Sequence, residues 1–298
     1  MIYKFYIAIW FLFLQVMLVF SQPVDSDIWL FQIKKNDQKI EFKNASNISQ
    51  HPGYDNQPFF SSDNKFILFT SIREGNQSDI YKYLIKSKKI IKVTSTATSE
   101  YSPVITPDGS NISVVMVEKD STQRIWKFNA SDKKEFEPYV ESDQQVMIPE
   151  VDRVGYYFWL NSDSLLYYKL TAPHSLHIYC ISTKKDIFLG NEPTRSFKSC
   201  GARKFFYVLK NENQNELRIY DWSIKKSEVA ALSEKKNEDF IWIKEYGLMK
   251  SAGSKLFFLD EKTKDWMEWG NFSNHGINNI TRFAISPDGK WLAVVNNL

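Results

Sequence analysis

Two short segments place an acidic side chain beside a tyrosine, and these residues have the clearest capacity for chemistry. They read Tyr54-Asp55-Asn56-Gln57-Pro58 and Ser99-Glu100-Tyr101-Ser102-Pro103, so Asp55 and Glu100 occupy equivalent positions. Carboxylates flanked by aromatic rings can bind a peptide, a basic segment of a partner, or a cation. Solvated charges that keep the edge of a protein soluble give the same pattern. The residues alone leave both interpretations open.

Further polar residues are candidates for the same set. They are Asn279, an acid at Glu238 or Asp239, and Glu150. If the chain brings these positions together, they would form a rim of carboxylates, amides and aromatic rings.

A second set of aspartates stands in turn sequences such as Thr106-Pro107-Asp108-Gly109-Ser110. Aspartate in such a turn normally accepts hydrogen bonds from its own backbone, so we expect a structural role. These aspartates also lie in separate repeats, so they do not form the paired carboxylates of acid–base catalysis. The set comprises Asp63, Asp108, Asp163 and Asp288.

The sequence lacks the common signatures of catalytic and cofactor sites. It contains no Gly-x-Ser-x-Gly nucleophile elbow, no glycine-rich phosphate loop before a helix and no Cys-x-x-Cys pair, and its four histidines are scattered. We therefore predict no catalytic residue, no metal site and no cofactor.

The turn sequences recur at a regular spacing. Asp63 and Asp108 are 45 positions apart, and Asp63 and Asp288 are 225 apart, which is five times that period. Downstream of each turn comes a segment with the two-residue alternation of a strand, then a short polar linker and one more apolar strand. Each unit is predicted to be a four-stranded antiparallel meander of about 45 residues, which buries its faces by radial stacking. No helix is expected after residue 21.

The two ends of the sequence complete each other. Residues 286–298 supply a Pro-Asp-Gly turn and one apolar strand, whereas Asp27-Ile28-Trp29-Leu30-Phe31 is a copy of the downstream segment with no turn before it. Residues 22–298 number 277, close to the 270 of six units of 45. We predict an all-β, six-bladed β-propeller of four-stranded antiparallel blades over residues 22–298. N-terminal strands (about 27–43) would pair with C-terminal strands (about 282–296) to close the last blade.

The turn-plus-strand pattern resembles the WD40-like (PD40) repeat of the TolB family. It is carried by Pro58 with Ser62-Asp63, Pro103 with Thr106-Pro107-Asp108-Gly109, and Ser286-Pro287-Asp288-Gly289. It is also similar to the propellers that precede prolyl-peptidase catalytic domains. The resemblance covers essentially the whole chain after residue 21, although units three to five depart from the pattern. It implies a six-bladed propeller in the cell envelope and carries over no specific partner.

Residues 1–21 are predicted to be a secretory signal peptide. Lys4 is their single charge, and the apolar run Phe5 to Phe20 ends just before Ser21. An uncleaved membrane anchor is the alternative, although this run of 16 residues is shorter than a typical span of about 20. In both cases the rest of the chain is exported, to the periplasm or the medium.

Charge and cysteine content add two expectations. The chain has 38 basic and 35 acidic residues and no long basic block, so no nucleic-acid partner is expected. Cys180 and Cys200 fall in neighbouring units, and both a disulfide and two free thiols are compatible with their positions.

Taken together, these features favour an exported, non-catalytic and monomeric propeller that binds a protein or peptide partner. Membrane contact is expected only through an uncleaved N-terminal segment. The alternative is an enzyme, a hydrolase or lyase that uses a cation or an acidic cluster at the channel mouth. A third interpretation is an accessory propeller for an enzyme or transporter. The candidate binding residues are Tyr54, Asp55, Glu100, Tyr101 and Asn279.

Overall fold

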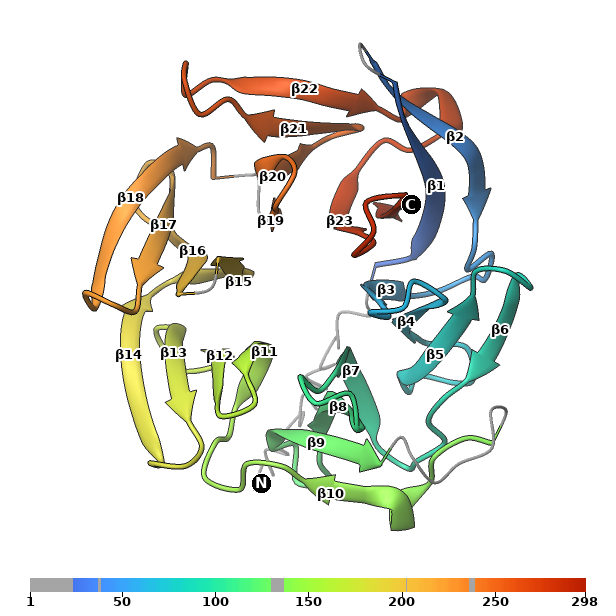
Figure 1. Cartoon of the computed structure of the whole chain (residues 1–298). Coiled ribbons are helices and arrows are strands. Elements are labelled where there is room, and N and C mark those ends of the chain that lie inside the picture. Colours follow the sequence, from blue (N-terminus) through green and yellow to red (C-terminus); the bar gives the residue numbers. More distant parts are fainter. Residues whose placement is uncertain (1–23, 37–38, 130–136, 202, 236–238) are drawn as a thin grey trace, which may run out of the picture.

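Six four-stranded antiparallel sheets are arranged as blades around a central axis (Figure 1). This computed structural model describes residues 24–36, 39–129, 137–201, 203–235 and 239–298. The predicted all-β, six-bladed propeller is confirmed. The predicted signal peptide, residues 1–21, lies outside the described residues and stays a prediction.

Each blade runs from an innermost strand at the axis to an outermost strand at the perimeter. Blade 1 contains β3 (Asp55–Phe60), β4 (Phe66–Ser71), β5 (Asp79–Leu84) and β6 (Lys89–Lys92), and blade 2 contains β7 (Ser99–Ile105), β8 (Asn111–Val117), β9 (Gln123–Asn129) and β10 (Gln144–Val146). Blade 3 contains β11 (Val154–Asn161), β12 (Ser164–Lys169), β13 (Ser175–Cys180) and β14 (Lys185–Asn191), and blade 4 contains β15 (Pro193–Gly201), β16 (Lys204–Lys210), β17 (Asn215–Asp221) and β18 (Lys226–Ser233). Blade 5 contains β19 (Phe240–Ile243), β20 (Gly247–Ala252), β21 (Lys255–Leu259) and β22 (Trp266–Asn271), and blade 6 contains β23 (Ile280–Ile285), β24 (Trp291–Asn297), β1 (Ser26–Asn36) and β2 (Lys39–Asn47).

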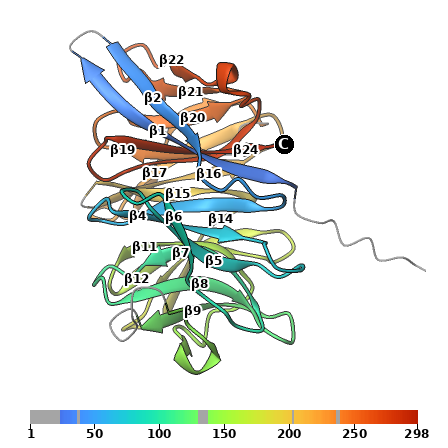
Figure 2. The same ribbon diagram turned by 90° about the vertical axis from the view of Figure 1, so that its right-hand side faces the viewer.

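Blade 6 is shared between the two ends of the chain, as predicted. Strand β1 lies between β2 and β24, and its pairing with β24 is continuous from Ser26 opposite Asn297 to Gln32 opposite Trp291. Beyond the strands, the Leu298 N–H donates to the Asp25 carbonyl at 2.9 Å. Figure 2 shows β1 and β24 side by side near the C-terminus. The N-terminal strands therefore supply the two strands that the C-terminal hairpin lacks.

The hydrophobic core consists of six clusters, each between two neighbouring blades. Strand β1 shows how the sequence produces this arrangement, because alternate side chains of a strand point to opposite faces of its sheet. Ile28 and Leu30 pack in the cluster shared with blade 1, whereas Phe31 and Ile33 pack in the cluster shared with blade 5. The ring of Phe31 meets that of Phe272 with centroids 4.9 Å apart.

Three of the four turn aspartates have the predicted structural role. In each case a Ser or Thr hydroxyl two residues earlier donates to the carboxylate, and the carboxylate accepts a backbone N–H two residues later. The hydroxyl–carboxylate pairs are Ser61–Asp63 (2.8 Å), Thr106–Asp108 (2.5 Å) and Ser286–Asp288 (2.7 Å).

Asp163 differs from the other three aspartates. Its carboxylate accepts the backbone N–H and the hydroxyl of Ser182, both at 2.8 Å, and thus connects two turns of blade 3 rather than stabilising its own. The expectation that this carboxylate accepts a backbone N–H of its own turn was wrong, because Ser182 of the β13–β14 hairpin supplies both donors.

Blade 2 departs most from the regular repeat. Its outermost strand β10 has three residues and follows a single 3-10 turn, η1 (Glu141–Asp143). A second such turn, η2 (Ser273–His275), follows β22. Residues Ser131-Asp132-Lys133-Lys134, which the repeat predicts to be the polar linker of this unit, lie outside the described residues.

Replacing Phe31 by alanine should destabilise the closing blade. Phe31 is 0% exposed, and deletion of a buried Phe side chain typically lowers the free energy of unfolding by about 3–5 kcal/mol. Phe188→Ala is the matched control, because Phe188 lies on an outermost strand and is 57% exposed, so its loss should cost less than about 1 kcal/mol. Urea unfolding of both variants measures the difference. Equal effects would contradict the packing described for β1.

Candidate functional site

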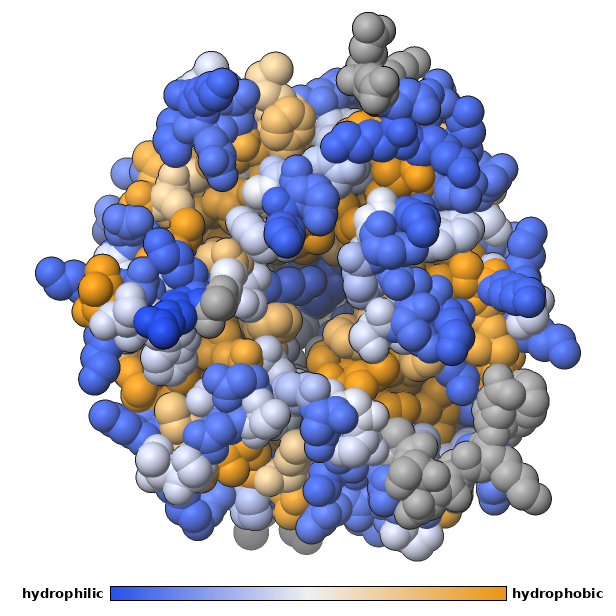
Figure 3. All heavy atoms as spheres, in the orientation of Figure 1, coloured by the Kyte–Doolittle hydropathy of each residue, from blue (hydrophilic) through white to orange (hydrophobic). Residues whose placement is uncertain are grey.

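The six innermost strands surround a cavity on the propeller axis. Its volume is about 150 Å3, and residues of β3, β7, β11, β15 and β23, together with Asp239 and β19, line it. Figure 3 shows this face hollowed at its centre, with hydrophilic residues at depth and apolar residues around part of the edge. The cavity is the point where side chains from all six blades can meet one ligand.

Hydrogen bonds connect neighbouring blades beside this cavity. In three places a side chain of one strand accepts the backbone N–H of a residue in the next blade, 44 or 45 positions later. The pairs are Gln57 with Ser102 N–H (2.7 Å), Ser196 with Phe240 N–H (2.9 Å) and Asp239 with Phe283 N–H (2.9 Å). These bonds join blades 1 and 2, blades 4 and 5, and blades 5 and 6 beside the channel.

Three cationic side chains line the cavity, and sequence reasoning did not identify them. They are Arg195 and Lys198 on β15, and Arg282 on β23. Arg195 donates one hydrogen bond, to the Thr281 carbonyl, and the Arg282 guanidinium lies 5.0 Å from the centroid of the Tyr156 ring. Within the described residues, the Nε atoms of both arginines are buried without a hydrogen-bond partner.

One acidic side chain lies among these cations. Asp239 is 7% exposed, and burial raises the pKa of its carboxyl although Arg195, Arg282 and Lys198 all act to lower it. Burial lowers the pKa of the Lys198 ammonium, against the effect of Asp239 and with that of Arg282. Among the described residues, the acidic and basic side chains that line the cavity are three cations and one carboxylate. This part of the channel is basic rather than acidic.

The structure places one of the predicted binding residues near this basic group. Tyr54 lies within electrostatic range of Arg282, Tyr156, Arg195 and Tyr101, and burial raises the pKa of its hydroxyl to about 12. Neither Tyr54 nor Tyr101 is among the residues that line the cavity itself.

Asn279 and Glu150 lie elsewhere. Asn279 is exposed, its backbone N–H is bonded to Asn296 Oδ1 at 3.1 Å, and it does not line the cavity. Glu150 is exposed and paired with Lys184 in the β13–β14 turn. Glu238 lies outside the described residues.

Asp55 and Glu100 are structurally equivalent, as predicted, but neither is solvated. Both are 0% exposed. The Asp55 carbonyl accepts the hydroxyl of Ser26 at 3.0 Å, and the Glu100 carbonyl accepts that of Ser78 at the same distance. Each serine directly precedes an Asp-Ile-aromatic segment of the previous blade, so Ser-Asp-Ile-Trp at Ser26 and Ser-Asp-Ile-Tyr at Ser78 are the sequence signal for this contact.

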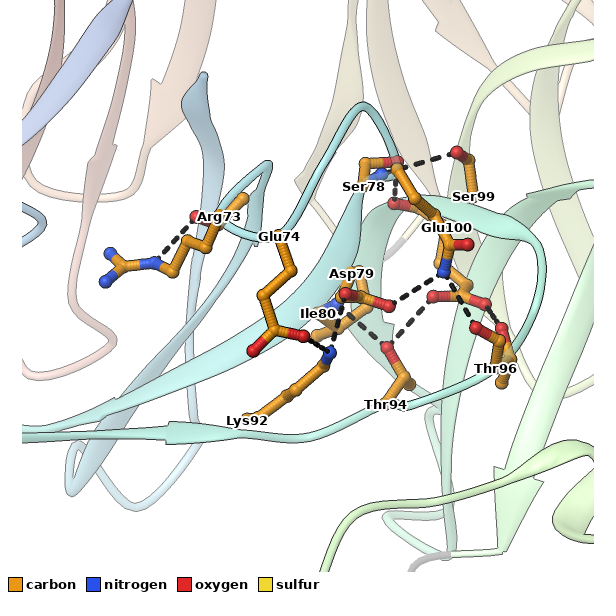
Figure 4. Close-up of polar contacts among 12 residues, drawn as sticks. Arg73, Glu74, Ser78, Asp79, Ile80, Lys92, Thr94, Thr96, Ser99 and Glu100 are labelled. Atoms are coloured by element: carbon orange, nitrogen blue, oxygen red, sulfur yellow. Dashed lines mark hydrogen bonds and ion pairs between the residues drawn. The ribbon is translucent and has the colours of Figure 1, made fainter. Parts of the chain in front are cut away.

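The two buried carboxylates have different partners. Asp55 Oδ1 lies 3.3 Å from Arg73 Nη2, and burial raises the pKa of this carboxyl more than Ser71 and Arg73 lower it. Glu100 Oε2 accepts the Thr94 hydroxyl at 2.9 Å, and Oε1 accepts the Thr96 hydroxyl. Figure 4 shows Glu100 among these groups, with Asp79 and Lys92 nearby.

Burial raises the pKa of Glu100 to about 8. Such a value suits a general acid or base, but that role also requires contact with the substrate. Both carboxyl oxygens are hydrogen-bonded to threonine hydroxyls, and the residue is inaccessible to solvent. The geometry therefore favours a part in joining blades 1 and 2.

The remaining candidate groups are possible metal ligands and the two cysteines. In the described part of the chain, no three His, Cys, Asp or Glu residues are grouped so that they could hold a metal ion. Cys180 and Cys200 are free thiols, and burial raises the pKa of Cys200 to about 11.

Comparisons with known proteins support the fold. No protein-family model matches the chain, and no curated protein matches it. Among solved structures, it is similar to a protein of Agrobacterium tumefaciens named as a TolB, with a TM-score of 0.66, 13% identity, and coverage of 93% of this chain and 99% of the other. TolB from Acinetobacter baumannii gives a TM-score of 0.50 at 13% identity, covering 70% of this chain and 52% of the other.

A gluconolactonase of Xanthomonas campestris is also similar, with a TM-score of 0.59, 7% identity, and coverage of 93% of this chain and 99% of the other. The solved structures that share the fold thus include both TolB propellers and an enzyme. At these identities the likeness concerns the fold. No helix in the described ranges is long and apolar enough to cross a membrane.

Replacing Glu100 by glutamine should make folding less sensitive to pH. Because the pKa of Glu100 is raised to about 8 from 4.5, the folded state binds this proton more tightly than the unfolded state does. Stability is then greatest below about pH 4.5 and falls as the pH rises toward 8, by up to about 1.4 kcal/mol per pH unit. Glutamine mimics the protonated form, so the variant should match the natural protein at pH 4.5 and exceed it by about 2–4 kcal/mol at pH 8.

Urea unfolding across this pH range tests the prediction, with Glu261→Gln, an exposed carboxylate between β21 and β22, as the control. If Glu100→Gln and the natural protein show the same pH profile, the burial assigned to Glu100 is contradicted.

Proposed function

We propose that this chain is an exported, non-catalytic propeller that binds a protein or peptide partner at the mouth of its central channel. One observation carries the proposal: cations and aromatic side chains from different blades line one cavity, and the Nε atoms of two of the cations, Arg195 and Arg282, have no hydrogen-bond partner within the described residues. A rigid ring that exposes such groups suits recognition, because the binding side chains are held in place before the partner arrives.

The enzyme alternative has less support. A hydrolase or lyase that uses an acidic cluster needs carboxylates that reach a substrate. Asp55 and Glu100 are inaccessible and hold blades together, so we assign them a positioning role and assign partner contact to Tyr54 and Tyr101. Export is supported by the sequence of residues 1–21 alone.

Photo-crosslinking inside the cells that produce the protein tests the proposal. With benzoylphenylalanine at Tyr54, we expect discrete adducts with a partner, because this side chain lies within electrostatic range of the channel cations Arg282 and Arg195. Phe188→benzoylphenylalanine is the matched control, on the exposed outermost strand β14. The same adducts at both positions, or none at Tyr54, would count against a binding site at the channel mouth.

A further inference from the structure

The strongest unexplained feature of the molecule is a pair of cations inside the channel with no protein acceptor. Among the described residues, neither the Lys198 ammonium nor the Arg282 guanidinium has a hydrogen-bond or ion-pair partner, and Arg195 uses a single bond, to a backbone carbonyl. Charged groups within a protein are normally paired, because burying an unpaired charge is costly. Two cations without a hydrogen-bond or ion-pair partner and a third with a single acceptor, all around one cavity, indicate a site for an anion.

We propose that Arg195, Lys198 and Arg282 bind a carboxylate group that a small organic acid or an acidic peptide segment carries into the channel. This inference rests on the proposed function, and it specifies the chemistry of what the channel accepts.

The charge balance of the cavity favours an anion. Blade 4 contributes Arg195 and Lys198, blade 6 contributes Arg282, and Asp239 comes from the segment just before β19 of blade 5. Three positive charges and one negative charge leave an excess of two positive charges. One carboxyl oxygen of Asp239 already accepts the Phe283 N–H. A bound anion would therefore meet an attractive potential, and low local polarity strengthens it.

The donor geometry favours a carboxylate. A guanidinium presents N–H groups in a planar arrangement that matches the two oxygens of a carboxylate, and Lys adds a point charge with three donors. Among the described residues, the two guanidinium groups make one hydrogen bond, from Arg195 Nη2 to the Thr281 carbonyl, so their terminal N–H donors are largely unpaired.

The walls and size of the cavity favour an organic acid over a free inorganic ion. Apolar side chains such as Pro58, Phe158 and Phe283 line it next to the cations. The volume of the cavity is small, about 150 Å3. It can take a carboxylate with a short apolar stem, such as one acidic side chain, but not a folded domain.

Isothermal titration calorimetry at low ionic strength provides the test. The probes are an N-acetylated, C-amidated triglutamate peptide, its triglutamine counterpart, succinate and inorganic phosphate. We expect binding of triglutamate and none of triglutamine. Comparable binding of succinate would assign recognition to the carboxylate group alone, whereas binding of triglutamate without succinate would assign it to a peptide segment. Phosphate binding as strong as that of the carboxylates would overturn the assignment.

Three variants locate the binding. Lys198→Gln with Arg282→Gln should weaken it at least about tenfold, because charged hydrogen bonds are lost. This double variant should melt no lower than the natural protein without ligand, since it removes unpaired buried charge. Lys86→Gln with Lys89→Gln makes the same charge change at two exposed positions of the β5–β6 hairpin and should leave binding unchanged. Asp239→Asn should tighten binding about threefold to tenfold, because a nearby negative charge is removed.

Two results would overturn the inference: no carboxylate probe binds the natural protein, or the Lys198 and Arg282 double variant binds as well as it does. Crosslinking at Tyr54 separates this failure from failure of the proposed function. If the natural protein binds no carboxylate but still forms partner adducts, the proposed partner-binding function stands and the carboxylate site is excluded.

Discussion

The insertion of β1 between β24 and β2 is the constraint on which the rest of the structure depends. Seven consecutive residues of β1, from Ser26 to Gln32, pair with β24, and the two faces of β1 pack against different neighbouring blades. A sheet edge left unpaired at this point would expose both its backbone groups and the side chains of those clusters to water. With the edge paired, six innermost strands hold fixed places around one axis. The channel is a consequence of that closure.

Polar residues near the axis form two groups: one joins neighbouring blades, and the other lines the cavity. Gln57, Ser196 and Asp239 accept backbone N–H groups of the next blade, and the carbonyls of Asp55 and Glu100 accept serine hydroxyls of the previous one. These groups are satisfied and hold the walls in place. Arg195, Lys198 and Arg282 are different, since they line the cavity and few acceptors in the described residues meet their donors. Natural proteins retain such destabilising groups where binding requires them.

The sequence predicts the architecture well because individual residues recur at the spacing of the repeat. Aspartates 45 positions apart and the isolated strand at Asp27–Phe31 are enough to indicate six units and their closure. The position of Tyr54 and Tyr101 also follows from the alignment of two units. The burial of Asp55 and Glu100 does not follow from that alignment, because it depends on the contacts between neighbouring blades, such as the hydrogen bonds from Ser26 and Ser78. Polar residues at the start of an inner strand look alike in sequence whether they face water or a neighbouring blade.

The cations were missed for a related reason. Arg195 and Arg282 lie in inner strands whose sequences have lost the acidic-aromatic pattern of the first two units, and a mixture of basic and phenylalanine residues is common in any half-buried strand. Only the closed ring shows that residues 87 positions apart in the sequence line the same cavity.

The most direct measurement is a crystal structure of the protein with a brominated benzoate, whose bromine can be located by anomalous scattering. The account predicts the benzoate in the channel, with its carboxylate oxygens about 2.7–3.2 Å from donors of Lys198 and Arg282. Benzoate bound only at lysines on the outer surface, with the channel arginines paired to protein acceptors, would contradict it.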